Sequence, residues 1–250
     1  MKTIKAIMLA GALAMTATAS AQFANTSNSN AASANAAGSI KDTNPYDRLS
    51  VSFMSETISP DKGDNTSLSG VSIDYIHGFS LSKTLPIFLE TGVDFSAGFK
   101  SNDVEEKNLL YGDSESVKTT LMSLAIPVNV AYKFNVNPDF SIQPFLGLNF
   151  KFNIVGKQKY KVEFKDSDEQ EDFDKYIEDS DIKLDTNMFD KKDLNDNKDA
   201  VWKRFQMGWH IGAGINYKQL WIGLSYGTDF ISLCKKTNTS TFKVGVGINF

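Results

Sequence analysis

Residues 122–134 have the sequence MSLAIPVNVAYKF, in which every second side chain is large and apolar. A period of two residues is that of a β-strand whose two faces meet different surroundings. The alternation runs well past the 5 to 6 residues, or about that, of an average strand. It reaches the roughly 9 to 11 residues that a tilted strand needs to cross a bilayer. This segment therefore predicts an unusually long β-strand.

The same alternation returns along the rest of the chain. Eight apolar series follow one another, and the first and last are the shortest. Their residues are 49–53, 71–81, 87–99, 122–134, 140–154, 205–217, 220–230 and 242–250. Eight such strands in succession predict an all-β fold, an eight-stranded antiparallel up-and-down β-barrel.

The two faces of these strands differ in composition. The apolar face contains no Asp, Glu, Lys or Arg in any of the eight series, and a charge at the bilayer midplane costs about 2 to 4 kcal/mol. The opposite face carries most of the 17 glycines, which suit the crowded interior of a small barrel and would weaken a water-exposed sheet. A soluble lipocalin-type barrel would turn the apolar face inward. The composition therefore favours a transmembrane barrel whose apolar face meets lipid.

The connections between the series alternate in length. Short links at 82–86, 135–139 and 218–219 follow the second, fourth and sixth series, and longer links follow the others. Short periplasmic turns and long extracellular loops are the rule for outer-membrane barrels. The long links are 57–69, 100–118, 156–203 and 231–238. We therefore expect both ends of the barrel chain to be periplasmic, with residues 156–203 as one long extracellular loop.

The start of the chain has the pattern of an exported protein. Lys2 and Lys5 precede an apolar stretch, and Ala19-Ser20-Ala21 is a cleavage signal. This predicts a signal peptide over residues 1–21, cleavage near Ala21 and location in the bacterial outer membrane. Residues 22–47 are rich in Asn, Ser and Ala, which is typical of a flexible segment. The barrel is then expected over residues 48–250. No other strongly apolar run exists, so a helical membrane protein is excluded.

Two segments resemble a known family. Residues 124–134, followed by a short turn and residues 143–148, look like the central hairpin of the outer-membrane β-barrel domain family known as porin-family or PorT-like proteins. The last nine residues are similar to the C-terminal assembly signal of bacterial outer-membrane barrels. Its residues here are Phe242, Val244, Val246, Ile248 and Phe250. The resemblance implies contact with the barrel-assembly machinery, periplasmic chaperones, outer-membrane lipid and lipopolysaccharide.

The inward face of the predicted barrel carries four charges of each sign. These residues are Asp74, Glu90, Asp94, Lys133, Lys151, Arg204, Asp229 and Lys243. An eight-stranded barrel is just wide enough for its own side chains to fill, and balanced charges in a partly dry interior form pairs. We therefore predict a lumen plugged by a charged side-chain network. A small-solute or ion porin is the alternative.

Catalytic, cofactor and metal chemistry find little support in the sequence. His77 falls on the lipid-facing side and His210 on the luminal side, and neither neighbourhood resembles a nucleophile–histidine–acid arrangement. Cys234 is the single cysteine, which excludes an internal disulfide. The segment 193–197 is similar to a calcium loop, but Lys198 replaces the turn glycine and Arg204 the bidentate glutamate, so an EF-hand is excluded. We predict a non-enzymatic protein without cofactor, with an outer-membrane enzyme as a remote alternative.

Other expectations concern partners and membrane anchoring. The chain has 26 basic and 30 acidic side chains, a balance that disfavours nucleic acid, and we expect a monomer. The loop over residues 156–203 has 15 acidic side chains against 10 lysines. It is interpreted as a solvated loop, a site for cations that bridge to lipopolysaccharide, or a contact for a surface ligand.

Interfacial aromatic girdles are expected from Tyr75, Tyr132, Trp209, Tyr217, Trp221 and Tyr226. Pro127 and Pro144 predict a bulge or a loosened ladder.

Overall fold

The computed structural model describes residues 42–104, 112–180, 183–194 and 197–250. The chain divides into two units, Met1–Gly38 and Ser39–Phe250, and every described residue belongs to the second unit. The predicted signal peptide and most of the segment 22–47 therefore lie outside the described residues. No helix in the described part of the chain is long and apolar enough to span a membrane.

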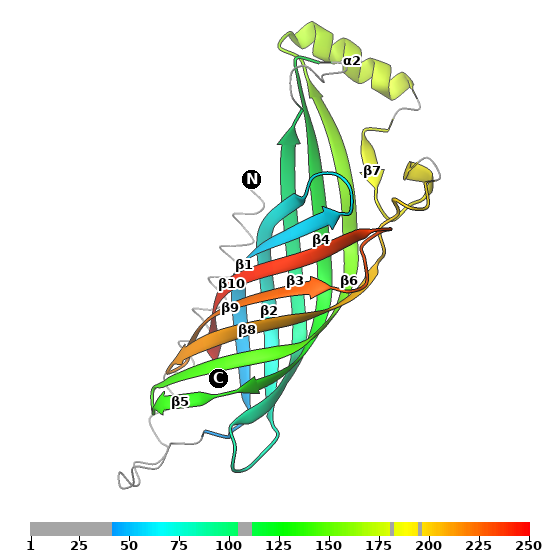
Figure 1. The fold of residues 1–250 in the computed structure, drawn as a ribbon. Coiled ribbons are helices and arrows are strands. Elements are labelled where there is room, and N and C mark those ends of the chain that lie inside the picture. Colours follow the sequence, from blue (N-terminus) through cyan, green and yellow to red (C-terminus); the bar gives the residue numbers. More distant parts are fainter. Residues whose placement is uncertain (1–41, 105–111, 181–182, 195–196) are drawn as a thin grey trace. The chain divides into compact units, whose positions relative to one another are not determined.

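Eight long antiparallel strands form a closed ring (Figure 1). Each strand pairs with its neighbours in the order β1, β2, β3, β4, β6, β8, β9, β10, and β10 pairs back with β1. The bounds are β1 Tyr46–Pro60, β2 Thr66–Ser80, β3 Ile87–Asp103, β4 Ser114–Tyr132, β6 Phe140–Glu163, β8 Phe205–Tyr217, β9 Leu220–Asp229 and β10 Thr237–Asn249. Two short strands, β5 (Phe134–Asn137) and β7 (Asp185–Asn187), pair with β6. The predicted eight-stranded antiparallel barrel is confirmed.

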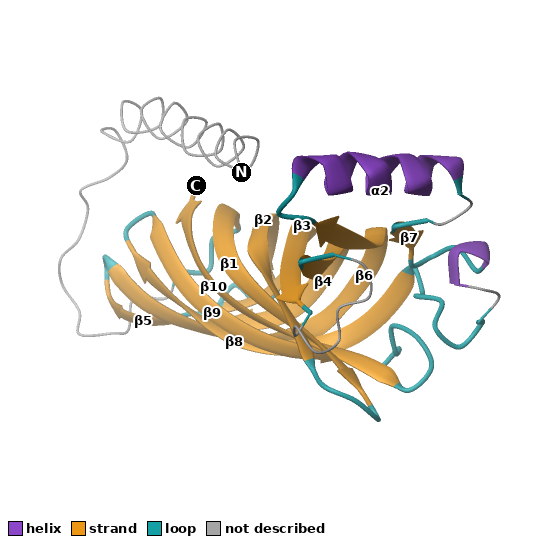
Figure 2. Ribbon diagram, turned by 90° about the horizontal axis from the view of Figure 1, so that it is seen from above, coloured by secondary structure: helices purple, strands orange, loops and turns teal. Residues whose placement is uncertain are grey.

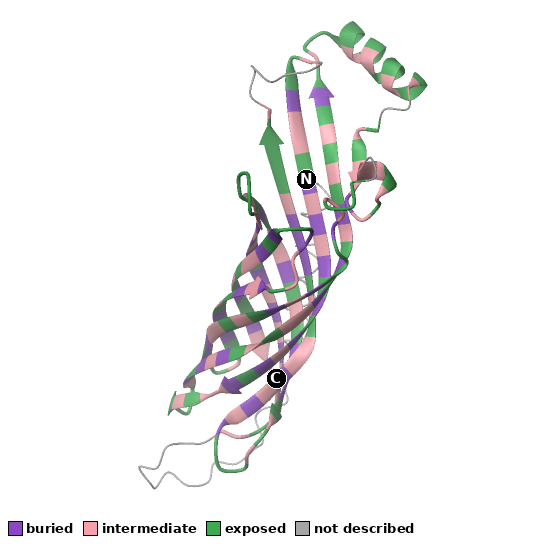
Figure 3. Ribbon diagram, turned by 45° about the vertical axis from the view of Figure 1, so that its right-hand side comes forward, coloured by how far each residue is buried: buried purple, intermediate pink, exposed green. Residues whose placement is uncertain are grey.

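The ring has its apolar side chains on the outside. Leu146 and Leu224 are each 55% exposed, whereas Ser50 and Glu90 are fully buried. Figure 3 shows the same alternation of exposed and buried residues along the strands. The interior is therefore polar and the exterior apolar, which is the reverse of a soluble protein.

The C-terminal strand closes the ring. β10 pairs with β1 from Arg48 opposite Asn249 to Pro60 opposite Thr237. One residue past the end of β10, Phe250 exchanges two backbone hydrogen bonds with Asp47 of β1, of 3.0 and 2.9 Å. The last residue of the chain thus extends the seam between the first and last strands.

The two prolines lie where a ladder is interrupted. On the β3–β4 seam, Thr91 pairs with Val128 and the pairing resumes only at Ala125, so Pro127 makes no pair there. Pro144 lies on β6 opposite the break between β4 and β5, and it pairs with Ala213 of β8. Since proline has no backbone N–H to donate, these gaps in the ladder accommodate both residues.

We call the end with the long connections the outer end and the end with the short turns the inner end. At the outer end the strands are longer than the apolar series suggests, and β4 and β6 pair as far as Ser114 opposite Glu163. Residues 156–163, expected in the long loop, therefore continue β6. The helix α2 (Ser167–Asp179) and the single turn η2 (Lys192–Leu194) follow; α2 is purple in Figure 2.

The start of α2 is fixed by its cap. The side chain of Asp166 accepts hydrogen bonds from the backbone N–H groups of Asp168 and Glu169, which satisfies donors that a helix leaves free at its N-terminus. Acidic residues in the first turn also suit the helix dipole. None of the residues of α2 is buried. The helix is therefore held by local interactions and presents its surface to solvent.

Candidate functional site

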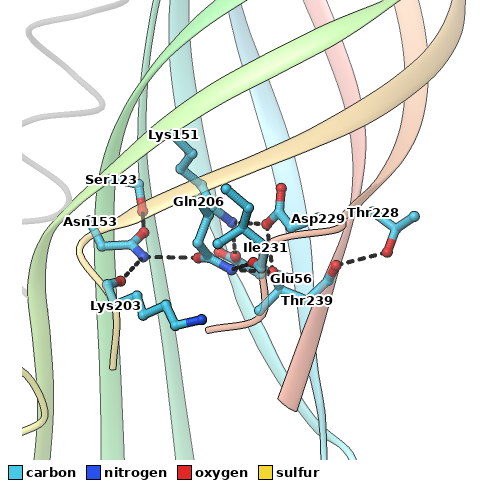
Figure 4. Close-up of polar contacts among 10 residues, drawn as sticks. All are labelled: Glu56, Ser123, Lys151, Asn153, Lys203, Gln206, Thr228, Asp229, Ile231 and Thr239. Carbon is cyan, nitrogen blue, oxygen red and sulfur yellow. Dashed lines mark hydrogen bonds and ion pairs between the residues drawn. The ribbon is translucent and has the colours of Figure 1, made fainter. Parts of the chain in front are cut away.

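The lumen near its outer end holds a buried triad of charges. The Nζ atom of Lys151 lies 2.8 Å from Oε1 of Glu56 and 2.6 Å from Oδ2 of Asp229. These side chains come from β6, β1 and β9, and all are less than one-tenth exposed. Thr239 donates a hydrogen bond to the same oxygen of Asp229. We call Lys151, Glu56 and Asp229 the outer charge cluster (Figure 4).

Neutral polar side chains extend this cluster across the lumen (Figure 4). Gln206 donates to Thr239 over 2.9 Å, and the amide of Asn153 donates to Gln206 over 2.9 Å. Ser123 in turn donates to Asn153 over 2.7 Å. These residues come from β8, β10, β6 and β4. The hydrogen-bond network thus joins strands on different sides of the ring.

An apolar cluster covers the outer end of the lumen. Three members come from the strands, and the others come from the two connections that flank β8 and β9. The members are Ile58, Leu68, Leu121, Met188, Trp202, Leu233 and Cys234, with Phe189 and Leu194 packed against them. Backbone hydrogen bonds hold the connections together, from Trp202 to Met188 over 2.8 Å and from Lys203 to Leu233 over 2.6 Å. We call these residues the apolar lid.

A second buried ion pair lies near the inner end. The guanidinium of Arg48 is 3.2 Å from Glu90 and lies 4.4 Å from the centre of the Trp221 ring. Glu90 also accepts hydrogen bonds from Tyr46 and Gln143. These residues form the inner charge cluster. The rings of Phe88 and Phe145 pack with Ala131 beside it and fill the inner end of the lumen.

Between the two clusters the lumen contains a cavity of about 100 Å³. Lys243 forms an ion pair with Asp94 there, and the hydroxyl of Ser50 donates to Asp74 over 2.5 Å. His210 also lines the cavity, with its ring 6.0 Å from that of Phe145. Such a volume has room for a few water molecules. Charged side chains therefore line this cavity together with apolar ones such as Phe145 and Trp221.

Six of the eight charged residues expected inside the barrel lie in the lumen. These are Asp74, Glu90, Asp94, Lys151, Asp229 and Lys243. They do not form one network, because Glu90, Asp94 and Asp229 each pair with a different cation. These charges therefore form three separate ion pairs or clusters along the lumen.

The other two residues of the predicted set lie outside the strands. Lys133 lies between β4 and β5, where its Nζ is 2.6 Å from Asp42 at the inner end. Arg204 precedes β8, is exposed and lies 4.3 Å from the ring centre of Phe189. Neither residue is within a strand, so the alternation of strand faces does not fix the direction of its side chain. The inward assignment of Arg204 was wrong.

Two luminal charges on β1 are absent from the set of residues predicted from the sequence. Arg48 and Glu56 belong to the inner and outer charge clusters, respectively. The apolar series on that strand covers only residues 49–53, whereas β1 runs over Tyr46–Pro60. If the alternation of residues 49–53 is continued to residue 47 at the start and to residue 57 at the end, Arg48 and Glu56 fall on the inward face. The polar face of the first strand was the available signal.

Trp221 is a further correction, because it was expected in the interfacial girdle. It is only 6% exposed and lies in the lumen, stacked on Arg48. Its neighbours Leu220 and Ile222 face outward, and alternation therefore directs Trp221 inward. The other expected girdle residues are at least partly exposed, and they are Tyr75, Tyr132, Trp209, Tyr217 and Tyr226.

The histidines are not set up for nucleophilic catalysis. Nδ1 of His77 lies 2.7 Å from Asp47, and His210 contacts Phe145. Within the described ranges, neither histidine is hydrogen-bonded to a Ser, Thr or Cys side chain. The same ranges contain no group of three or more His, Cys, Asp or Glu side chains placed to hold a metal ion.

The segment that is similar to a calcium loop is partly described. Asp193 accepts a hydrogen bond from Lys183 over 2.9 Å and another from the backbone N–H of Asn187 over 3.1 Å. The bond from Lys183 lowers the pKa of the Asp193 carboxyl, and the pKa of the Lys183 amine is raised in return. Residues 195–196 lie outside the described residues. Both oxygens of Asp193 are thus occupied by protein donors.

The solved structures that are similar to this chain include the following three. Ail of Yersinia pestis, in complex with the heparin analogue sucrose octasulfate, is 16% identical, with 82% of this chain and 99% of Ail covered and a TM-score of 0.37. Neisserial surface protein A is 13% identical, with 82% and 97% covered and a TM-score of 0.41. The outer membrane enzyme PagL is 10% identical, with 79% and 98% covered and a TM-score of 0.32.

A search of curated proteins finds no significant match. A family model described as outer membrane protein beta-barrel domain matches residues 23–234, which include seven of the eight ring strands in full. This match agrees with the closed ring, the apolar exterior and the polar lumen, and it confirms the resemblance seen in the sequence. The chain is a small bacterial outer-membrane β-barrel and belongs to the outer membrane protein beta-barrel domain family.

Proposed function

We propose that this protein is a non-enzymatic outer-membrane barrel with a closed lumen and a structural or surface-interaction role. In this proposal the inner end faces the periplasm and the outer end faces the outside of the cell, as the rule of short and long connections requires. The observation that supports it best is the filling of the lumen at both ends. The outer charge cluster lies beneath the apolar lid, and the inner charge cluster packs beside Phe88.

The energetics of buried charges support a closed lumen. Lys151 is flanked by two carboxylates at hydrogen-bond distance, and breaking such a buried cluster leaves an uncompensated charge. An ion that passed this point would have to separate these groups or pass beside them. Charges that are paired within the protein therefore act as a plug rather than as the lining of a conduit.

The surface role is assigned to the projecting part of residues 156–203. The ends of β4 and β6 carry α2, whose surface is strongly acidic and whose Tyr176 is 56% exposed. Phe173 of the helix contacts Phe164, with 5.3 Å between ring centres, so the hairpin and the helix form a joined structure. A surface ligand would meet this region first.

A small-solute or ion porin is the second candidate function. The cavity of about 100 Å³, with its charged wall, favours it. Conduction would require a path through both charge clusters and past the lid. A bilayer measurement separates the two candidates.

The closed lumen predicts that the purified protein gives no steady single-channel conductance in planar bilayers. The reason is that paired charges and apolar side chains occupy both ends of the lumen. Heat-denatured protein serves as the control for bilayer damage. Stable open steps whose ion selectivity changes in the Asp94→Lys variant would contradict the plug, because Asp94 lines the central cavity.

We also propose that the end of β10 is the assembly signal read by the barrel-assembly machinery, after periplasmic chaperones deliver the chain. Its outward side chains are Phe242, Val244, Val246, Ile248 and Phe250. The backbone of Phe250 further pairs with Asp47 across the closing seam. The residues of the proposed assembly signal are therefore also residues that pair with β1 to close the ring.

Deleting Phe250 is expected to reduce the amount of folded barrel in the outer membrane. The deletion removes both an exposed aromatic and two backbone hydrogen bonds of the seam. The measurement is heat-modifiable mobility on detergent gels of outer-membrane fractions. Phe53→Ala, which also removes an outward-facing ring, is the matched control. Equal amounts of folded barrel from the deletion and from the wild type would refute the assigned signal.

A further inference from the structure

Lysines gather on the outward face of the hairpin where β4 and β6 leave the apolar band. Lys157 and Lys159 alternate along β6, and Lys118 faces them from β4; all three are exposed. The residues between them point to the other side, where Thr119 and Leu121 are buried. Because directly paired residues share one face of a sheet, the three ammonium groups lie on the same surface. We call Lys118, Lys157 and Lys159 the basic face.

Two of these lysines are direct neighbours across the strands. Lys118 pairs with Lys159 in the β4–β6 register, and Thr120 pairs with Lys157 beside them. Like charges directly opposite one another destabilise a sheet. The pair therefore costs stability in isolation, and an anion bound between the lysines would remove that cost.

Among the described residues, the acidic groups that contact this hairpin leave much of this charge unbalanced. Lys159 lies 3.6 Å from Asp185, but both side chains are more than half exposed, and such pairs contribute little. Glu163 is held by Lys161, and this hydrogen bond, with a smaller effect of Lys118, lowers the pKa of the Glu163 carboxyl. In the part of the chain that the structure describes, neither Lys118 nor Lys157 forms an ion pair.

The position of the basic face relates it to the membrane. The outward pair that precedes it, Met122 opposite Val155, is apolar, and Leu124 and Phe152 follow toward the membrane. A strand rises about 3.3 Å per residue, so Lys157 begins roughly 7 Å beyond Val155. Lysines at this height can extend along apolar surface and place the ammonium group in the polar layer. That layer of the outer leaflet carries the phosphates of lipopolysaccharide.

We propose that the basic face of Lys118, Lys157 and Lys159 binds a phosphate group of lipopolysaccharide in the outer leaflet. The recognised chemistry is a phosphate ester anion held by ammonium groups. The site rests on the membrane orientation given under the proposed function and is independent of whether the lumen is closed. It explains why the charges of the hairpin are segregated, with lysines next to the membrane and the acidic α2 farther along the chain and beyond the ends of the strands (Figure 1).

The test compares ligands that differ in phosphate and in origin. Full-length mature protein in phosphatidylcholine nanodiscs is titrated with lipid A that carries its phosphates, with dephosphorylated lipid A and with inorganic phosphate. The triple variant Lys118→Gln, Lys157→Gln and Lys159→Gln removes the basic face. A matched control removes three exposed lysines elsewhere, Lys165, Lys175 and Lys198. Heat-modifiable mobility checks that every variant is folded.

The triple variant is expected to bind phosphorylated lipid A on the order of a hundredfold more weakly, since each lysine near an anionic surface contributes about 1 kcal/mol, or roughly fivefold. The control variant and a triple arginine variant of the basic face should bind like the wild type. Higher salt should weaken wild-type binding more than that of the glutamine variant.

Three outcomes would overturn the assignment. Equal affinity of the wild type and the glutamine variant would remove the basic face from binding. Equal affinity for phosphorylated and dephosphorylated lipid A would remove the phosphate. Inorganic phosphate that binds as tightly as lipid A would assign the site to a free anion. Since these lysines lie outside the lumen, none of these results depends on the conductance measurement.

Discussion

Replacing Lys151 with methionine is expected to lower the free energy of unfolding by about 3 to 5 kcal/mol, the usual effect of removing one partner of a buried charge cluster. Its ammonium group is the cation between Glu56 and Asp229 in the outer charge cluster. Without it, two buried carboxylates would face each other with no cation between them. The unfolded chain carries no such penalty, so the whole effect appears in stability.

The measurement is equilibrium unfolding in urea of the barrel in lipid vesicles, followed by tryptophan fluorescence. Lys157→Met is the matched control, because Lys157 lies on the same strand but is exposed, and its effect should stay within about 0.5 kcal/mol. Adding Glu56→Gln and Asp229→Asn to Lys151→Met should recover most of the loss, since no uncompensated charge is left. A Lys151→Met protein as stable as the wild type would refute the pairing.

Replacing Gly223 with valine is expected to destabilise the barrel by about 3 kcal/mol through overpacking. A Cβ atom at Gly223 would lie 2.1 Å from Cζ2 of Trp221, and one at Gly214 would lie 2.1 Å from Nε1 of the same ring. Gly214 and Gly223 are paired across β8 and β9. The indole therefore lies over a glycine pair that leaves room for it, with Arg48 on it.

A double-mutant cycle tests this arrangement. Trp221→Ala removes the ring, so Gly223→Val should cost much less in that background than in the wild type. Ala213→Val is the control, because Ala213 is the outward-facing neighbour of Gly214 and its added methyl groups meet lipid. The same unfolding assay applies. If the valine is equally costly with and without the tryptophan, the contact between Trp221 and Gly223 does not limit packing.

The strand pattern was predictable because it is a local property of the chain. Apolar side chains at every second position identify each ring strand and its lipid face, from Phe53 on β1 to Val246 on β10. The pattern fails where the outward face of a strand leaves the apolar band and becomes polar. On the outer part of β6, Lys157 and Lys159 replace apolar residues, so the strand continues past the point at which the alternation fades.

The direction of single side chains was predictable only inside strands. Asp94 and Lys243 follow the alternation and meet in the lumen. Arg204 stands one residue before β8, where no ladder fixes the backbone, and its guanidinium lies over Phe189 instead. Trp221 shows the opposite case. Its position in the lumen follows from the alternation of the two strand faces, although tryptophan side chains are enriched at the membrane interface.

By itself, the sequence determined the eight strands, their order and the face that meets lipid, since each depends on neighbours along the chain. Only the tertiary structure decided which charges meet. Lys151 and Glu56 are 95 residues apart, and Arg48 and Glu90 are 42 apart. Their pairing depends on the tilt and register of the closed ring, which shift each strand along its neighbours. The apolar lid likewise exists only because closure of the ring brings two distant connections together over one opening.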